Sequence, residues 1–184
     1  MIKFSEYYIN ELSMRAPIHK DILYVHDYLT RDDPEYNDEY KKIRDTSYAI
    51  KDKNNMDDIK LAAKEMASLV SPGNVLVPIP NSKGDTSANL VLANEISKLT
   101  SSKVEDVLGI KAPKQSNREL AISGKDRLHP TKLGLVLTDK IKNANDVLFI
   151  DNVLTSGSTI RGAINLINGG NGLVYSKVKH KGQY

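Results

Sequence analysis

The chain contains no cysteine, and this absence removes two kinds of site at once. Disulfides and thiolate-bound metals are excluded, because both need cysteine sulfur. The four histidines are scattered along the chain without metal-ligand spacing; they are His19, His26, His129 and His180. The sequence therefore offers no recognisable set of sulfur or imidazole ligands for a metal.

Long apolar runs are missing as well. No stretch approaches the roughly 18 apolar residues that a membrane-spanning helix needs. The opening segment, MIKFSEYYINEL, is too polar for the apolar region of a signal peptide. We therefore expect a reduced, cytoplasmic protein with no membrane partner.

A strong charge of either sign is also absent, since the net charge is +3 over 184 residues. This small charge does not favour nucleic acid as a partner, although a local basic patch remains open. Hydrophobic residues make up 40% of the chain and charged residues 27%, as in ordinary folded proteins. The length suits one domain with a core, or one domain with a small cap.

Apolar residues recur at helical spacing in three segments. The first segment predicts a helix that begins after its cap at Asn55 and ends before Pro72 and Gly73. The other two segments predict helices at 86–99 and 158–168. Strands are expected at 75–79, 103–110, 146–150 and 172–178, while 132–137 is either a short strand or part of a loop.

Alternation of strands and helices predicts an α/β fold with a parallel sheet flanked by helices. We assign residues 56–184 to this core. Residues 1–55 are rich in Tyr, Asp and Lys without a long apolar period, and we assign them to a small N-terminal hood or cap. The whole is expected to form a single compact domain.

A small polar segment follows the most apolar of the expected strands. The run 147–150 is entirely apolar, and IDNVLTSGST (150–159) turns polar just before a helix. In a parallel sheet this segment lies at the carboxyl edge, where ligands bind. Its hydroxyls, its backbone N–H groups and the positive end of the helix suit a phosphate, and Asp151 suits a sugar diol. The alternative without function is a tight turn in which Ser and Thr cap the helix.

The segment VLFIDNVLTSGST (147–159) resembles the PRPP-binding motif of the type I phosphoribosyltransferases, where PRPP is 5-phosphoribosyl 1-pyrophosphate. Neither G-x-G-x-x-G nor G-x-x-x-x-G-K-[ST] occurs in the chain. The resemblance implies a type I phosphoribosyltransferase-like fold, with Asp151 and Asn152 as catalytic residues on the ribose hydroxyls. It also implies a cradle for the 5-phosphate, made by Thr155, Ser156, Gly157, Ser158 and Thr159.

The resemblance further implies Mg²⁺ as the cofactor. Asp151 would be the metal ligand of the protein, and the substrate would supply most of the other ligands. The family pattern has two acids, whereas this chain has Asn152 as the second residue. An amide can hydrogen-bond a diol, but it adds no negative charge beside magnesium or C1 of the ribose.

A second polar loop, PNSKGDTS (80–87), follows the first expected strand of the core. In the resembled family a loop at this place binds the pyrophosphate. The candidate residues are Asn81, Ser82, Lys83 and Gly84. The alternative is a polar connection in which Asp85 or Thr86 caps the next helix.

A basic connection covers residues 111–132 and includes Lys114, Arg118 and Arg127. Long connections without regular structure are usually functional or disordered. We interpret this one as a flexible loop that closes over the pyrophosphate and excludes water. A solvated loop with scattered charges is the alternative.

Over roughly residues 43–178 the order of motifs is similar to the ComF-type, competence-associated phosphoribosyltransferase-like proteins. The resemblance implies a small-molecule acceptor chosen by the cap, with contacts expected from Tyr28, Tyr36, Tyr40 and Tyr48, and it is compatible with a homodimer. The leading hypothesis is transfer of phosphoribose from PRPP to a nitrogen acceptor, with a nucleobase as the expected class. The alternatives are a non-catalytic PRPP-binding sensor or competence-type accessory protein, and direct nucleic-acid binding through the basic loop.

Overall fold

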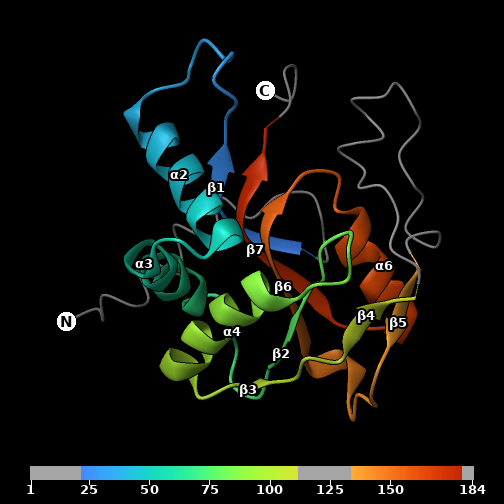
Figure 1. The fold of residues 1–184 in the computed structure, drawn as a ribbon. Coiled ribbons are helices and arrows are strands. Elements are labelled where there is room, and N and C mark those ends of the chain that lie inside the picture. Colours follow the sequence, from blue (N-terminus) through green and yellow to red (C-terminus); the bar gives the residue numbers. More distant parts are fainter. Residues whose placement is uncertain (1–21, 112–133, 180–184) are drawn as a thin grey trace.

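The computed structural model describes residues 22–111 and 134–179 (Figure 1). Its central sheet contains five parallel strands in the order β1-β7-β6-β2-β3. Their bounds are β1 Ile22–Tyr28, β2 Val75–Pro78, β3 Lys103–Val104, β6 Val147–Leu154 and β7 Asn171–Val178. The predicted α/β architecture with a parallel sheet is confirmed.

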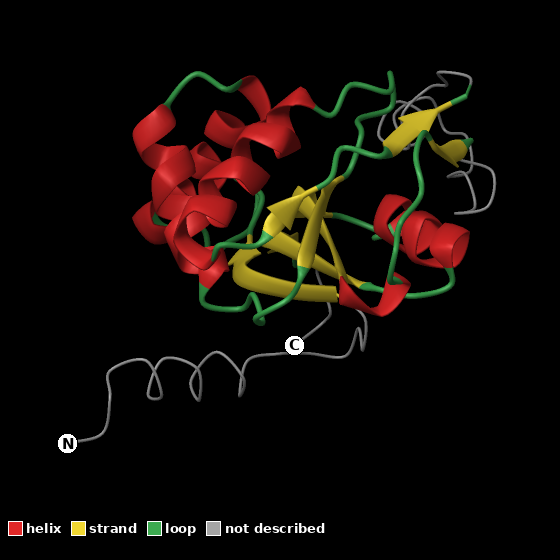
Figure 2. Ribbon diagram, turned by 90° about the horizontal axis from the view of Figure 1, so that it is seen from below, coloured by secondary structure: helices red, strands yellow, loops and turns green. Residues whose placement is uncertain are grey.

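Helices cover both faces of this sheet. Three lie on one face, namely α2 (Asp38–Asp52), α3 (Met56–Ala67) and α4 (Ser87–Thr100), and α6 (Ser158–Ile167) lies on the other (Figure 2). None of the helices in the described ranges combines the length and the apolar character needed to cross a bilayer.

Side-chain alternation in β6 explains why both faces are covered. Leu148 and Ile150 belong to the apolar cluster shared with α2, α3 and α4, whereas Val147 and Phe149 belong to the cluster shared with α6. All four side chains are buried. A strand that is apolar on both faces is stable only between two layers, as its continuous apolar sequence predicts.

Residues 22–52 lie in the expected cap region, yet they contribute to the central core. β1 pairs with β7 along its length and forms one edge of the sheet. α2 buries Ile43 and Ile50 against the same apolar cluster as α3 and α4. The described part of the N-terminal region therefore supplies both a strand and a core helix.

Local capping sets the start of α3 where the sequence predicts it. The side-chain oxygen of Asn55 accepts hydrogen bonds from the N–H groups of Asp57 (3.1 Å) and Asp58 (3.4 Å). These bonds satisfy two of the N–H groups that a helix start leaves without partners.

The segment 103–110 differs from the single strand that the sequence predicts. Only β3 joins the central sheet, and β4 (Leu108–Ile110) pairs antiparallel with β5 (Leu135–Leu137) in a separate two-stranded sheet. Between them, the N–H of Glu105 still donates to Leu76 O (2.9 Å), and Asp106 accepts from the hydroxyl of Thr86 (2.9 Å). The prediction of one strand is wrong, because the spacing of apolar residues along the sequence does not show where a strand changes its pairing partner.

Candidate functional site

Two helices leave neighbouring strands toward opposite faces of the sheet. α4 follows β2 to the face that carries α2 and α3, and α6 follows β6 to the other face. Because β2 and β6 are adjacent, the loops that follow them diverge at the carboxyl edge. Open α/β sheets bind ligands at such switch points. The switch point between β2 and β6 is flanked by the segments 80–87 and 155–159, both of which the sequence predicted to bind phosphate groups.

β6 runs further than its neighbour β2. Pro78 is the last residue of β2 and lies opposite Ile150, to whose carbonyl the N–H of Ile79 donates (2.9 Å). β6 then continues through Leu154, paired with β7. Asp151 therefore lies within the strand, beside the point where β2 has ended, and not at the tip of β6.

Asn89 of α4 occupies the space beside Asp151. Its Nδ2 donates to Asp151 Oδ1 (3.0 Å) and to the carbonyl of Ile79 (2.8 Å). The side chain is 8% exposed, so both bonds form away from bulk water. Sequence reasoning missed this residue. The available signal was an amide at helical spacing from the apolar residues Leu92 and Ile96.

The carboxyl group of Asp151 is strongly desolvated although the residue keeps some exposed surface. Burial raises its pKa to about 6, while hydrogen bonds from the backbone N–H of Asn152 (2.8 Å) and from Asn89 oppose the rise. Asp151 thus carries a negative charge at neutral pH and titrates in a weakly acidic range.

Asn152 turns toward α2. Its Nδ2 donates to the carbonyl of Ser47 (3.2 Å), and the hydroxyl of Ser47 lies 2.9 Å from that of Ser176 in β7. Asp151 and Asn152 thus have different partners, Asn89 of α4 for the first and Ser47 of α2 for the second. The structure places Asp151 at the switch point and uses Asn152 to join β6 to α2.

The polar loop after β6 is short. It covers Thr155–Gly157, and Ser158 and Thr159 already belong to the first turn of α6. The hydroxyls of Ser156 and Ser158 lie 2.8 Å apart. Gly157, at the N-cap position, makes no side-chain cap bond. The start of α6 thus presents hydroxyls and helical N–H groups together, which suits an anion.

Gly157 is required by the backbone and by its neighbours. Its φ of +70° lies in the left-handed region, which side chains disfavour. A Cβ at this position would lie 3.0 Å from Cδ1 of Leu154 and 3.3 Å from Cζ of Arg161. Glycine therefore lets the loop close tightly onto α6.

Arg161 is a second residue that sequence reasoning missed. Its Nη1 donates to the carbonyl of Ser156 (2.6 Å), and its backbone N–H donates to that of Gly157 (2.9 Å). The guanidinium thus fixes the backbone of the polar loop and adds positive charge beside it. The only signal in the sequence was a cation in the first turn after the loop.

The loop 80–87 is held by its own side chains. Asn81 Oδ1 accepts from the N–H groups of Lys83 (2.8 Å) and Asp85 (3.1 Å), and the N–H of Gly84 donates to the carbonyl of Asn81 (2.9 Å). Asn81 and Lys83 are exposed, and Ser82 is half-buried. Asn81 therefore shapes the loop, and several of its N–H groups already have internal partners.

A carboxylate already occupies the start of α4. Asp85 accepts from the backbone N–H (2.9 Å) and the hydroxyl (3.0 Å) of Ser87. These bonds lower the pKa of Asp85, with a smaller contribution from the charge of Lys53. The N-cap position of α4 is Thr86, which makes no side-chain cap bond, and Asp85, one residue earlier, accepts from the first N–H of the helix.

The predicted loop cations Lys114, Arg118 and Arg127 lie outside the described residues. Of the described residues on either side of them, Lys111 donates its N–H to the carbonyl of Gly134 (2.9 Å). Ile110, one residue earlier, lies 3.7 Å from the position of a Cβ on Gly84. Ile110, which precedes the segment, therefore lies beside the loop 80–87.

Tyr48, one of the expected acceptor contacts, lies on α2 beside Arg44. The guanidinium of Arg44 is 5.0 Å from the centre of the Tyr48 ring. Both residues line a hollow of about 560 Å³ along α2; its other lining residues are Arg31, Asp45, Ala49, Asn54, Asn55 and Asp58. Tyr40 packs instead against the core cluster of α2, α3 and α4.

Comparison with models of protein families finds none that matches the chain, and comparison with curated proteins also finds no match.

Proposed function

We propose that this protein binds PRPP at the switch point between β2 and β6 and acts as a phosphoribosyltransferase of the type I class. One observation carries the proposal: Asp151 lies at the switch point, where one loop leads from β2 to the start of α4 and another leads from β6 to the start of α6. A sugar that bears a phosphate at one end and a pyrophosphate at the other needs anion sites on both sides of a hydroxyl-binding acid.

In this assignment the 5-phosphate binds at the start of α6. Ser156, Ser158 and Thr159 offer hydroxyls, and the first turn of α6 offers N–H groups and the positive end of its dipole. Arg161 holds the carbonyl of Ser156, which keeps the loop in this shape. Asp151 accepts hydrogen bonds from the ribose hydroxyls.

Mg²⁺ fits the residues present as a metal held mainly by the substrate. Among residues 22–111 and 134–179, no group of three His, Asp or Glu side chains gathers that could hold an ion by itself. Mg²⁺ is commonly bound through one or two carboxylates together with substrate phosphates. Asp151 would be that carboxylate. When bound, the metal would neutralise charge on the pyrophosphate.

The reaction would break the bond from C1 of the ribose to a pyrophosphate oxygen and form a bond from C1 to the acceptor nitrogen. Pyrophosphate leaves with the electron pair, and positive charge develops at C1. The ionised carboxylate of Asp151 stabilises that charge. The remaining task of the protein is to hold both reactants in place.

Binding without transfer is the second candidate, and Asn152 favours it. Its amide is directed to the carbonyl of Ser47, and Asp151 is the one acid within β6. A PRPP sensor would need the phosphate and ribose contacts but no second negative charge near C1.

Titration calorimetry with PRPP and Mg²⁺ tests the proposal on the full chain. We expect binding by the wild type and loss of binding in Asp151→Ala, whereas Asp139→Asn, a change at an exposed acid, binds normally. Equal affinity in all three proteins would contradict the proposed ribose site. Pyrophosphate release with a panel of nucleobases then separates transfer from binding alone.

A further inference from the structure

Lys53 lies at the C-terminal end of α2 in an uncommon backbone conformation. It is the C-cap residue of that helix, with φ of +54°. Side chains disfavour this left-handed region, and glycine adopts it without strain. The conformation turns the chain from α2 toward α3 and leaves Lys53 exposed.

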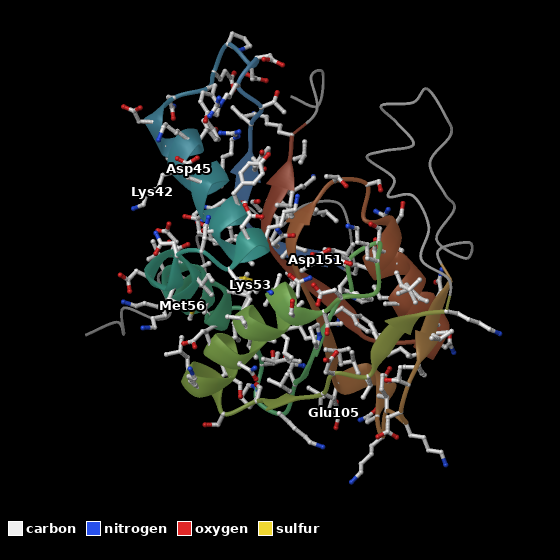
Figure 3. The ribbon with its side chains drawn as sticks, viewed as in Figure 1. Lys42, Asp45, Lys53, Met56, Glu105 and Asp151 are labelled. Carbon is white, nitrogen blue, oxygen red and sulfur yellow. The ribbon has the colours of Figure 1, made fainter. Side chains whose placement is uncertain are left out.

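The side chain of Lys53 reaches the start of α4. Its Nζ donates to the hydroxyl of Ser87 (2.8 Å), which in turn donates to Asp85 Oδ2 (3.0 Å). Two residues further along the same helix, Asn89 donates to Asp151. Figure 3 shows Lys53 and Asp151 close to the first turn of α4, on separate elements. A cation from α2 is thus joined to the switch point through one helical turn.

We propose that Lys53 is the cation that binds the pyrophosphate group of PRPP, and that this group displaces Asp85 from its place beside Ser87 and Lys53. The inference rests on the proposed function and adds to it a residue outside both polar loops. In the free protein, one carboxylate stands where the more highly charged pyrophosphate would bind.

Charge favours this exchange. Lys53 and the first turn of α4 contribute positive potential to one place, and Asp85 is exposed, so it can leave that place at little cost in burial. Lys83, the cation that the sequence suggested, lies in the exposed turn of the loop 80–87. The ammonium of Lys53 lies within hydrogen-bonding distance of the first residue of α4.

The variant Lys53→Gly removes the charge of Lys53 and should keep the fold intact. Glycine accepts the left-handed conformation, so the variant should unfold at the same temperature as the wild type or higher. Lys51→Ala is the matched control, because Lys51 is exposed in the last turn of the same helix. Asp85→Asn removes the competing charge and keeps an oxygen that can accept from Ser87.

Titration calorimetry with Mg²⁺ and three separate ligands tests the proposal: inorganic pyrophosphate, ribose 5-phosphate and PRPP. In Lys53→Gly we expect the dissociation constants of pyrophosphate and PRPP to rise about tenfold or more, since a charge-assisted hydrogen bond is lost. Ribose 5-phosphate should bind as to the wild type. Lys51→Ala should leave all three constants unchanged, and Asp85→Asn should tighten pyrophosphate.

Two results would overturn the inference, and they differ. If PRPP binds the wild type and Lys53→Gly equally well, Lys53 is not the cation and the proposed function stands. If the wild type binds neither PRPP nor either fragment, the proposed function fails and the inference fails with it.

Discussion

Asp151 and Asn152 are neighbours in the sequence, but their side chains bond to different helices. Asp151 accepts from Asn89 of α4, and Asn152 donates to Ser47 of α2. The first is a desolvated acid at the switch point, and the second is a link between the strand and a helix. Changes at these two positions should therefore alter different properties.

For Asp151 the expected effect is on the pH dependence of stability. Its pKa is 3.8 ordinarily and about 6 in the fold, so the folded state binds the proton more tightly than the unfolded chain. The stability that depends on this proton is fully present below pH 4 and is lost as the pH rises through 6. The free energy of unfolding should fall by up to about 3 kcal/mol over this range.

Asp151→Asn removes that dependence, because an amide does not titrate. Urea unfolding between pH 4 and pH 8 measures it as the difference between variant and wild type. We expect similar stabilities near pH 4 and a more stable variant above pH 6. A difference that stays constant with pH would show that the carboxyl group is not desolvated.

Asn152→Asp is expected to destabilise the fold by roughly 1–3 kcal/mol, since it replaces a donor to the carbonyl of Ser47 with a second acceptor. Urea unfolding at pH 7 measures the change, and Asn171→Asp at an exposed position is the control. An unchanged or higher stability for Asn152→Asp would mean that the amide donor is dispensable.

At the scale of elements, the connection between β6 and α6 is built around one backbone conformation. Gly157 adopts φ of +70°, and the turn brings Leu154 and Arg161 against it. Gly73 provides a comparison, because it has φ of +89° but nothing lies within 4 Å of its Cβ position. Both glycines adopt a left-handed backbone conformation, but only Gly157 has neighbouring atoms close to the position of a Cβ.

Gly157→Ala should therefore cost more stability than Gly73→Ala. Strain alone costs about 1–2 kcal/mol at a left-handed position, and the close contact adds to it at Gly157 only. Urea unfolding gives both values, and calorimetry with PRPP should show weaker binding for Gly157→Ala alone. Equal costs would mean that the loop relaxes around the added methyl group.

At the scale of the whole molecule, the candidate site joins segments that are far apart in the chain. α2 brings Lys53 to the start of α4, β6 brings Asp151, and α6 follows β6 to the other face. A ligand that contacts all of these parts must stabilise the fold as a unit.

Thermal unfolding measures that linkage. With PRPP and Mg²⁺ at about 100 times the dissociation constant, we expect about 2.7 kcal/mol of added stability. For a domain of this size the midpoint should rise by roughly 5 to 10 °C. Asp151→Ala should show no such rise. A rise of the same size in that variant would place the ligand elsewhere on the protein.

Local sequence determined the helices α3, α4 and α6, most of the strands and the position of the polar loops, but it did not predict α2 or β1. Asn55 caps α3 and the apolar run before Asp151 forms a buried strand, because capping and side-chain alternation depend on residues a few positions apart. For the same reason the segment 155–159 could be placed between a strand and a helix.

Only the tertiary structure decided the strand order and the partners of the polar side chains. The adjacency of β2 and β6, the direction of Asn152 and the contacts of Asn89 and Lys53 each join residues that lie far apart along the chain. No local pattern encodes such contacts, since they form only when the layers pack. The sequence thus specified a polar loop between a buried strand and a helix, and the packing of α2 and α4 decided which side chains meet Asp151 and Asn152.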